Sequence, residues 1–172
     1  MGLILTLIED DAAAAQLLGT AAGLGTPVAV APAGSGADPP EAERVAAFGA
    51  AGAARVVLVE GAARAWPHAQ PGAVAAVLAD LAAGSLGEDA AAVLAPGDAF
   101  GAEVGALLAL ALDSGVVTDA IRIAPDFSAT KAVMAETALV DVGVARGLPI
   151  FTIGAAAAPE PAAPVAAPVV SR

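Results

Sequence analysis

The sequence contains 172 residues, of which 58% are hydrophobic, 15% charged and 3% aromatic, a length that suits one domain with its own core. Seven Lys and Arg residues against 18 Asp and Glu residues give a formal net charge of −11, which opposes binding to nucleic acid and to anionic membrane surfaces. The absence of cysteine excludes disulfides, cysteine-bound metal centres and a thiol nucleophile, and the single histidine, His68, excludes a multi-histidine metal site within one copy.

The N-terminal residues, MGLILTLIEDD, are apolar at once, lack a basic region and run into three acids. This pattern is typical of a buried strand and not of a secretory signal. The longest stretch without charge, residues 12–37, is interrupted by Pro27, Pro32 and several glycines, whereas a membrane-spanning helix needs about 20 uniformly apolar residues. We therefore expect a cytoplasmic protein without membrane insertion.

Short apolar runs then alternate with alanine-rich amphipathic runs, which is the pattern of parallel strands separated by covering helices. Asp11 is the expected N-cap of the first helix, which ends in the glycines at 19, 23 and 25. In chain order, the predicted elements are strand 3–8, the helix after Asp11, strand 28–33, helix 41–51, strand 55–59, helix 73–83, strand 91–95 and helix 99–112. These βα units favour an open sandwich, because a (β/α)8 barrel would need roughly twice as many.

The pattern changes after this last helix. Three strand-like segments, 116–123, 137–144 and 148–153, follow one another without a helix of useful length between them. Arg146-Gly147 indicates a hairpin turn between the last two segments.

Residues 155–172 are rich in proline and alanine, and they predict a flexible tail with nothing to bury. The domain itself is expected to cover residues 1–154. Its predicted fold is a Rossmann-like three-layer α/β sandwich, with a mostly parallel sheet and a C-terminal edge hairpin.

Two glycine-rich stretches, 19–25 and 33–37, superficially suggest phosphate-binding loops. A dinucleotide fingerprint has to sit between a first strand and its helix, whereas the first stretch lies at a helix end and the second lacks the third glycine. No Gly-Lys-Ser/Thr follows either stretch, so we interpret both as helix ends and turns.

Glu9, Glu60 and Asp98 each follow a predicted parallel strand at its carboxyl end, where open α/β sheets bind ligands. Three carboxylates there could hold a divalent metal or contact ribose hydroxyls. The alternative is that they cap the following helices and face water. We favour this alternative, because no basic residue stands nearby in the sequence to hold a phosphate, and we assign no cofactor-binding or metal-ligating residue.

His68 follows Trp66-Pro67 and could act as a general base. No serine or cysteine nucleophile motif such as G-x-S-x-G accompanies it, and neither Asp113-Ser114 nor Ser128 completes a triad. We interpret His68 as a residue that anchors its loop, and we assign no catalytic residue.

Two neighbouring segments carry a resemblance to a known family. Residues 91–101 read AAVLAPGDAFG, and residues 107–121 read LLALALDSGVVTDAI. They resemble the electron transfer flavoprotein alpha subunit, whose N-terminal domain carries an LAP-x-x-x-FG strand, turn and helix followed by LL-D-x-x-x-x-SD-x-I. Residues 4–9, the strand at 55–59 and His68 before a helix are also similar, so the resemblance covers the whole predicted domain.

The sequence departs from this family pattern in three places. Residues 131–136 stand where the family has an Arg-Pro-Ile-Tyr-Ala-Gly-Asn-type segment, and the helix after the FG carries only Glu103 where the family often has Lys and Arg. The Ser-Arg, Thr-Gly-Lys and Gly-Ile-Ser-Gly-Ala-x-Gln-His motifs of the family's flavin-binding C-terminal domain have no counterpart here. No flavin-contacting residue can therefore be assigned to any position of this sequence.

The resemblance implies an adenine nucleotide alpha hydrolase-like fold and a scaffolding role. In that family the domain packs against a beta subunit and supports a mobile flavin domain. We therefore expect a non-catalytic component of a flavin electron-transfer assembly that binds no cofactor by itself, with FAD held in the assembled complex. The expected partner is a beta-type subunit or a second copy in a homodimer, with an interface on the strands at 137–144 and 148–153.

Two alternatives stay open. The chain could be a small nucleotide-binding protein that takes AMP or ATP in the crevice beside Glu60 and Asp98. It could also be an oligomeric remnant that has lost its original task.

Overall fold

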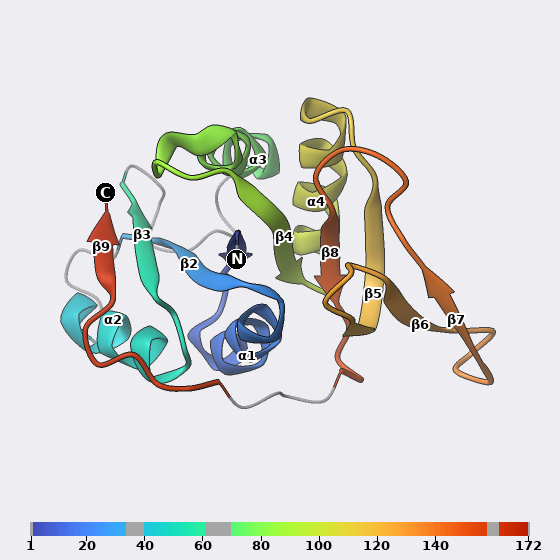
Figure 1. Ribbon diagram of the computed structural model, residues 1–172, viewed down its shortest axis with the longest axis horizontal. Coiled ribbons are helices and arrows are strands. Elements are labelled where there is room, and N and C mark those ends of the chain that lie inside the picture. The colour runs from blue at the N-terminus through green and yellow to red at the C-terminus, as the bar shows by residue number, and fades with distance from the viewer. Residues whose placement is uncertain (1, 34–39, 61–69, 158–161, 172) are drawn as a thin grey trace.

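Nine strands form one sheet in the computed structural model, which describes residues 2–33, 40–60, 70–157 and 162–171 (Figure 1). The strands lie in the order β7-β6-β5-β8-β4-β1-β2-β3-β9. Every neighbouring pair from β5 to β9 in this order is parallel, whereas β5–β6 and β6–β7 are antiparallel. The bounds are β1 (Leu3–Leu7), β2 (Thr26–Pro32), β3 (Arg55–Val59), β4 (Ala90–Pro96), β5 (Val116–Ile123), β6 (Ala129–Val133), β7 (Ala138–Val142), β8 (Ile150–Ile153) and β9 (Val169–Ser171).

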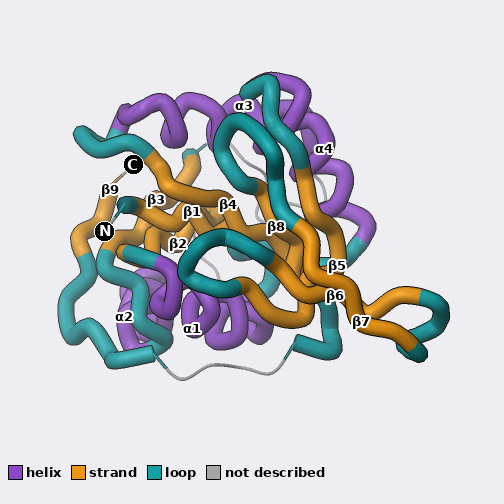
Figure 2. The backbone as a smooth tube through the Cα atoms, turned by 45° about the vertical axis from the view of Figure 1, so that its right-hand side comes forward, coloured by secondary structure: helices purple, strands orange, loops and turns teal. Residues whose placement is uncertain are grey.

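Helices cover both faces of this sheet, as Figure 2 shows. One face packs against α1 (Ala14–Leu24) and α2 (Glu41–Ala50), and the other against α3 (Pro71–Asp80) and α4 (Ala99–Ala111). A 3-10 turn, η1 (Asp11–Ala13), precedes α1, and a π-helical turn, η3 (Leu81–Ser85), extends α3. No helix in the described ranges is both long and apolar enough to cross a membrane. The predicted three-layer Rossmann-like sandwich is confirmed.

The first strand, β1, explains why the central strands are aliphatic throughout. Leu3, Leu5 and Leu7 pack on the side of α3 and α4, whereas Ile4 packs on the side of α1 and α2. All four side chains are at most 2% exposed. Because successive side chains of a strand point to opposite faces, a strand covered on both faces needs an apolar residue at nearly every position.

Asp10, and not Asp11, caps the first helical turn. The Asp10 carboxylate accepts a hydrogen bond from the Ala12 backbone N–H at 3.0 Å. Asp11 instead accepts two hydrogen bonds from the Arg44 guanidinium of α2, at 2.9 and 3.1 Å, and Arg44 also donates to the Pro32 carbonyl at 3.0 Å. The predicted cap at Asp11 is therefore wrong, because a cation distant in the sequence binds that carboxylate.

The predicted hairpin between 137–144 and 148–153 is also wrong. β7 pairs antiparallel with β6, a strand that the prediction omitted, so β6 and β7 form the edge hairpin. The turn between them contains Met134, Ala135 and Glu136, all with positive φ. None of the three is a glycine, so the sequence carries no turn signal at this place.

β8 lies between β4 and β5, parallel to both, and all four of its residues are buried. Residues 148–153 therefore cannot form the outer interface expected there. The chain does turn at Gly147, which has a φ of 74°, but the turn leads into the middle of the sheet. The Ser114 hydroxyl holds this approach by donating to the Leu148 carbonyl at 2.5 Å.

Part of the predicted tail forms the ninth strand. β9 pairs in parallel with β3, and Val56 lies opposite Val170. A few residues N-terminal to β9, the Val165 backbone N–H donates a hydrogen bond to the Gly49 carbonyl at the end of α2, at 2.7 Å. The prediction of a tail with nothing to bury is thus wrong for residues 162–171, because their partners lie far back in the chain. The domain boundary at residue 154 stays a prediction.

Candidate functional site

The chain reverses its progress across the sheet between β1 and β4. Strands β1, β2 and β3 follow one another toward one edge, and β4 then returns to the other side of β1. Open α/β sheets bind ligands beyond the carboxyl ends of the strands at such a reversal. Glu9 follows β1 and Asp98 follows β4, and the structure brings these two predicted residues into contact there.

Asp98 is held at the N-terminus of α4, where its Oδ1 accepts a hydrogen bond from the Gly101 backbone N–H at 2.7 Å. The surrounding loop leaves no room for side chains at two positions. A Cβ on Gly101 would lie 2.1 Å from the Pro96 carbonyl oxygen, and a Cβ on Gly97 would lie 2.3 Å from the Ile153 carbonyl oxygen. The two glycines therefore let the loop pack against β4 and β8, which fixes the position of the Asp98 carboxylate.

Glu9 is half-buried beside Asp98. Its Oε2 is buried and accepts no hydrogen bond from a donor group among the described residues. Burial, the hydrogen bond with Asp98 and the negative charges of Asp98 and Asp10 raise the pKa of Glu9 from 4.5 to about 7. Two carboxyl groups can form a hydrogen bond with each other only when one of them carries a proton. Glu9 therefore stays protonated at pH values well above those at which an ordinary glutamate ionises.

A cavity of about 220 Å³ opens beside Asp98, between the start of α1 and the ends of β4 and β8. The polar side chains in its lining are Asp98 and Gln16, and Gln16 Nε2 already donates to the Ala157 carbonyl at 2.7 Å. Pockets for small molecules usually measure about 300–1,000 Å³. The described residues therefore offer a phosphate group a small space, an acid and no cation.

Sequence reasoning missed Gln16 as a lining residue. The sequence could have indicated it in one way only, because Gln16 is the single long polar side chain of α1, whose other residues are mostly small or apolar. The contact between Glu9 and Asp98 was missed as well, because β1 and β4 become neighbours only when the sheet forms.

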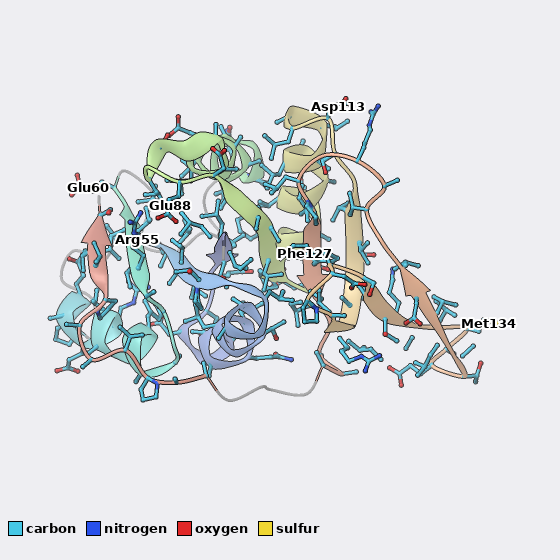
Figure 3. All side chains as sticks on the ribbon, in the orientation of Figure 1. Arg55, Glu60, Glu88, Asp113, Phe127 and Met134 are labelled. Carbon is cyan, nitrogen blue, oxygen red and sulfur yellow. The ribbon has the colours of Figure 1, made fainter. Side chains whose placement is uncertain are left out.

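Glu60 does not join the acid pair. It follows β3, which is separated from β1 by β2, and its side chain is exposed (Figure 3). Within the described part of the chain, no group of three or more His, Cys, Asp or Glu side chains is placed to hold a metal ion. The three strand-end acids therefore form no single site.

The remaining sequence candidates do not add to the site. Gly23 and Gly25 lie in the last turn of α1 and at its C-cap, as predicted, whereas Gly19 lies in the middle of the helix and does not end it. Ser128 donates to Asp126 Oδ1 at 2.7 Å, within one turn. His68 and most of the 33–37 stretch lie outside the described residues.

Comparisons with known proteins show which family this fold and sequence match. Residues 5–171 match the family model described as the electron transfer flavoprotein domain. The matched range contains α1, α2, α3 and α4 and extends to the end of β9, so the similarity follows the whole fold and not only the LAP-x-x-x-FG segment. The comparison with curated proteins gives no match.

Proposed function

Because the chain belongs to the electron transfer flavoprotein domain family, we propose that it acts as a non-catalytic partner domain in an electron-transfer assembly of that type. The observation that carries the proposal is the family match over nearly the whole chain. The acid pair and the small cavity at the strand ends support a structural role in preference to catalysis. A cytoplasmic location belongs to the same proposal.

The assembly we propose contains a beta-type electron transfer flavoprotein subunit or a second copy of this chain. Sedimentation velocity of the purified chain, alone and mixed with a beta-type subunit encoded in the same genome, tests this directly. A complex that sediments faster than either component supports the role. A chain that stays monomeric alone and in every such mixture contradicts it.

We further propose that residues 1–172 bind no FAD by themselves and that FAD belongs to the assembled complex. Beyond the carboxyl ends of β1 and β4, the pyrophosphate of FAD would meet the Glu9–Asp98 pair. The net charge of −11 also opposes the approach of this anionic group. Fluorescence titration of FAD with the chain at physiological salt is the test. Saturation in the low micromolar range or below would contradict this part of the proposal.

Binding of AMP or ATP in the same crevice is the second candidate function. The position of the cavity at the sheet reversal favours it, whereas the acid pair opposes the phosphates. Denaturing the freshly purified protein and analysing the supernatant for nucleotides separates the two candidates. A nucleotide present in near-equimolar amount would favour the second, and its absence together with a beta-type complex would favour the first.

A further inference from the structure

The antiparallel pair β6 and β7, called the arm (residues 129–142), projects from the rest of the sheet (Figure 1, Figure 2). β7 is the last strand in the sheet order, so its outer edge has no neighbouring strand among the described residues. Such an edge presents backbone N–H and C=O groups that can pair with a strand of another chain.

The arm also exposes large apolar side chains. Leu139 is 65% exposed and Val140 is 38% exposed, both on β7 itself. Met134, at the outer tip of the arm, is 78% exposed (Figure 3). Because successive side chains of a strand point to opposite faces, Leu139 and Val140 expose apolar surface on both faces of the arm next to the open edge of β7.

Proteins usually protect an exposed edge with proline, lysine or a very short strand. β7 has five residues, no proline and no lysine. Its only charged residue is Asp141, whose Oδ1 accepts a hydrogen bond from Thr130 Oγ1 at 2.7 Å. The opposite edge strand, β9, has only three residues. The edge of β7 is therefore the less protected of the two.

The charge distribution indicates which partner suits this edge. Residues 116–148, from β5 to the approach to β8, hold three basic and four acidic side chains, whereas the rest of the chain holds four basic and 14 acidic ones. A second copy of this acidic chain therefore meets the least repulsion if it approaches the arm. A strongly basic partner would gain little there.

We propose that β7 pairs antiparallel with β7 of a second copy, about a two-fold axis that passes at Val140; this inference rests on the proposed role as a partner domain. Val140 then lies opposite Val140 of the second copy, and Ala138 lies opposite Val142. Leu139 lies opposite Asp141 of the second copy, so no two like charges face each other. Both copies use the same patch, as a two-fold interface requires.

The arm is held in shape before any partner arrives. Lys131 Nζ donates to Thr118 Oγ1 of β5 at 3.1 Å, which ties β6 to the sheet. At the turn, Thr137 Oγ1 donates to the Met134 carbonyl at 2.7 Å. A preformed edge loses little conformational freedom on binding, which favours association.

The test compares two substitutions at one position, measured by light scattering on the full chain at about 10–100 µM, a range in which weak specific dimers are populated. Leu139→Asp places an acid opposite Asp141 of the second copy, twice per dimer, and should weaken dimerisation by at least about tenfold. Leu139→Lys places a base opposite the same Asp141 and should keep the dimer. Leu110→Asp, at an 80% exposed leucine on α4, is the matched control and should leave the dimer unchanged.

The expected result is a wild-type mass of twice 16.3 kDa that Leu139→Asp alone reduces to the monomer. Circular dichroism and the thermal midpoint of each variant verify that the monomer is folded. A monomeric wild-type chain overturns the inference, as does a Leu139→Asp variant that dimerises as strongly as wild type. An equal loss of dimer in Leu139→Asp and Leu139→Lys overturns the proposed pairing about Val140.

Failure of this inference and failure of the proposed function are distinguishable. A wild-type monomer that still binds a beta-type subunit overturns only the self-pairing of β7. A chain that binds neither itself nor a beta-type subunit overturns both.

Discussion

The centre of the sheet and the β6–β7 arm are both rich in aliphatic residues, but only the centre is covered. Leu94 in β4 is fully buried in the core on the side of α1 and α2, whereas Leu139 in β7 is 65% exposed. The connections explain the difference. Parallel strands β1 to β4 are joined by helices that return across the sheet and cover it, whereas β5, β6 and β7 are joined by short turns that bring no cover. Aliphatic composition alone thus distinguishes strands from loops, but not covered strands from exposed ones.

The largest expected effect comes from shortening one leucine in each region. Leu94→Ala should reduce the free energy of unfolding by about 3 kcal/mol, because it leaves a cavity in a closely packed core. Leu139→Ala should change it by less than about 0.5 kcal/mol in the monomer, because the side chain is mostly in water. Urea unfolding at a concentration where the chain is monomeric measures both. Similar losses for the two variants would contradict the distinction between the regions.

Removal of residues 158–172 extends the comparison to the opposite edge. The shortened chain should lose about 1–2 kcal/mol of unfolding free energy, because β3 loses its outer neighbour and the Gly49 carbonyl loses its hydrogen bond from Val165. The full chain with Val170→Thr is the control and should stay within about 0.5 kcal/mol of wild type, since this exposed position keeps the backbone pairing. An unchanged unfolding midpoint in the shortened chain would contradict the role of β9 as a stabilising strand.

The smallest expected effect concerns the carboxyl pair at the end of β1. The pKa of Glu9 is about 7 in the folded chain and 4.5 ordinarily, so its neutral form contributes stability fully below pH 4.5. That contribution falls as the pH rises from about 4.5 to 7, because the unfolded chain loses the proton first. Glu9→Gln should remove this decline and stabilise the chain at pH 8 by about 1 kcal/mol. Unfolding measured from pH 4.5 to pH 8 gives the slope.

Asp126→Asn, at the turn before the arm, is the control for this slope. Hydrogen bonds from Ser128 lower the pKa of Asp126 below its ordinary 3.8, so it stays ionised throughout the same pH range. Its substitution should leave the decline between pH 4.5 and 7 in place. A wild-type chain with no decline in this range would contradict the shared proton between Glu9 and Asp98.

The sequence predicts the helical part of the fold well and the C-terminal part poorly. Strand 55–59 and strand 116–123 match the structure at both ends, and the βα alternation gives the layers correctly. These features depend on local periodicity, which each segment carries by itself. β6 was missed because it lies between two turns whose positive-φ residues are not glycine, and β9 was missed because it lies in a proline-rich segment whose partner is β3.

The candidate site was predictable only in part. The positions of Glu9 and Asp98 after parallel strands follow from the chain order, and so does the helix cap at Asp98. Their contact does not follow, because it needs the order of strands in the sheet. The exposure of Leu139 could not be predicted for the same reason, since the sequence pattern of a strand is the same whether or not a helix covers the strand.

The central claim is that this chain works as a partner domain of an electron transfer flavoprotein-type assembly. Native mass spectrometry of the tagged chain, purified from its own cells at physiological salt, tests it most directly. The predicted result is a complex that contains a second copy or an identified beta-type subunit. A spectrum with only the monomer of the tagged chain, at concentrations up to those in the cell, would contradict the claim.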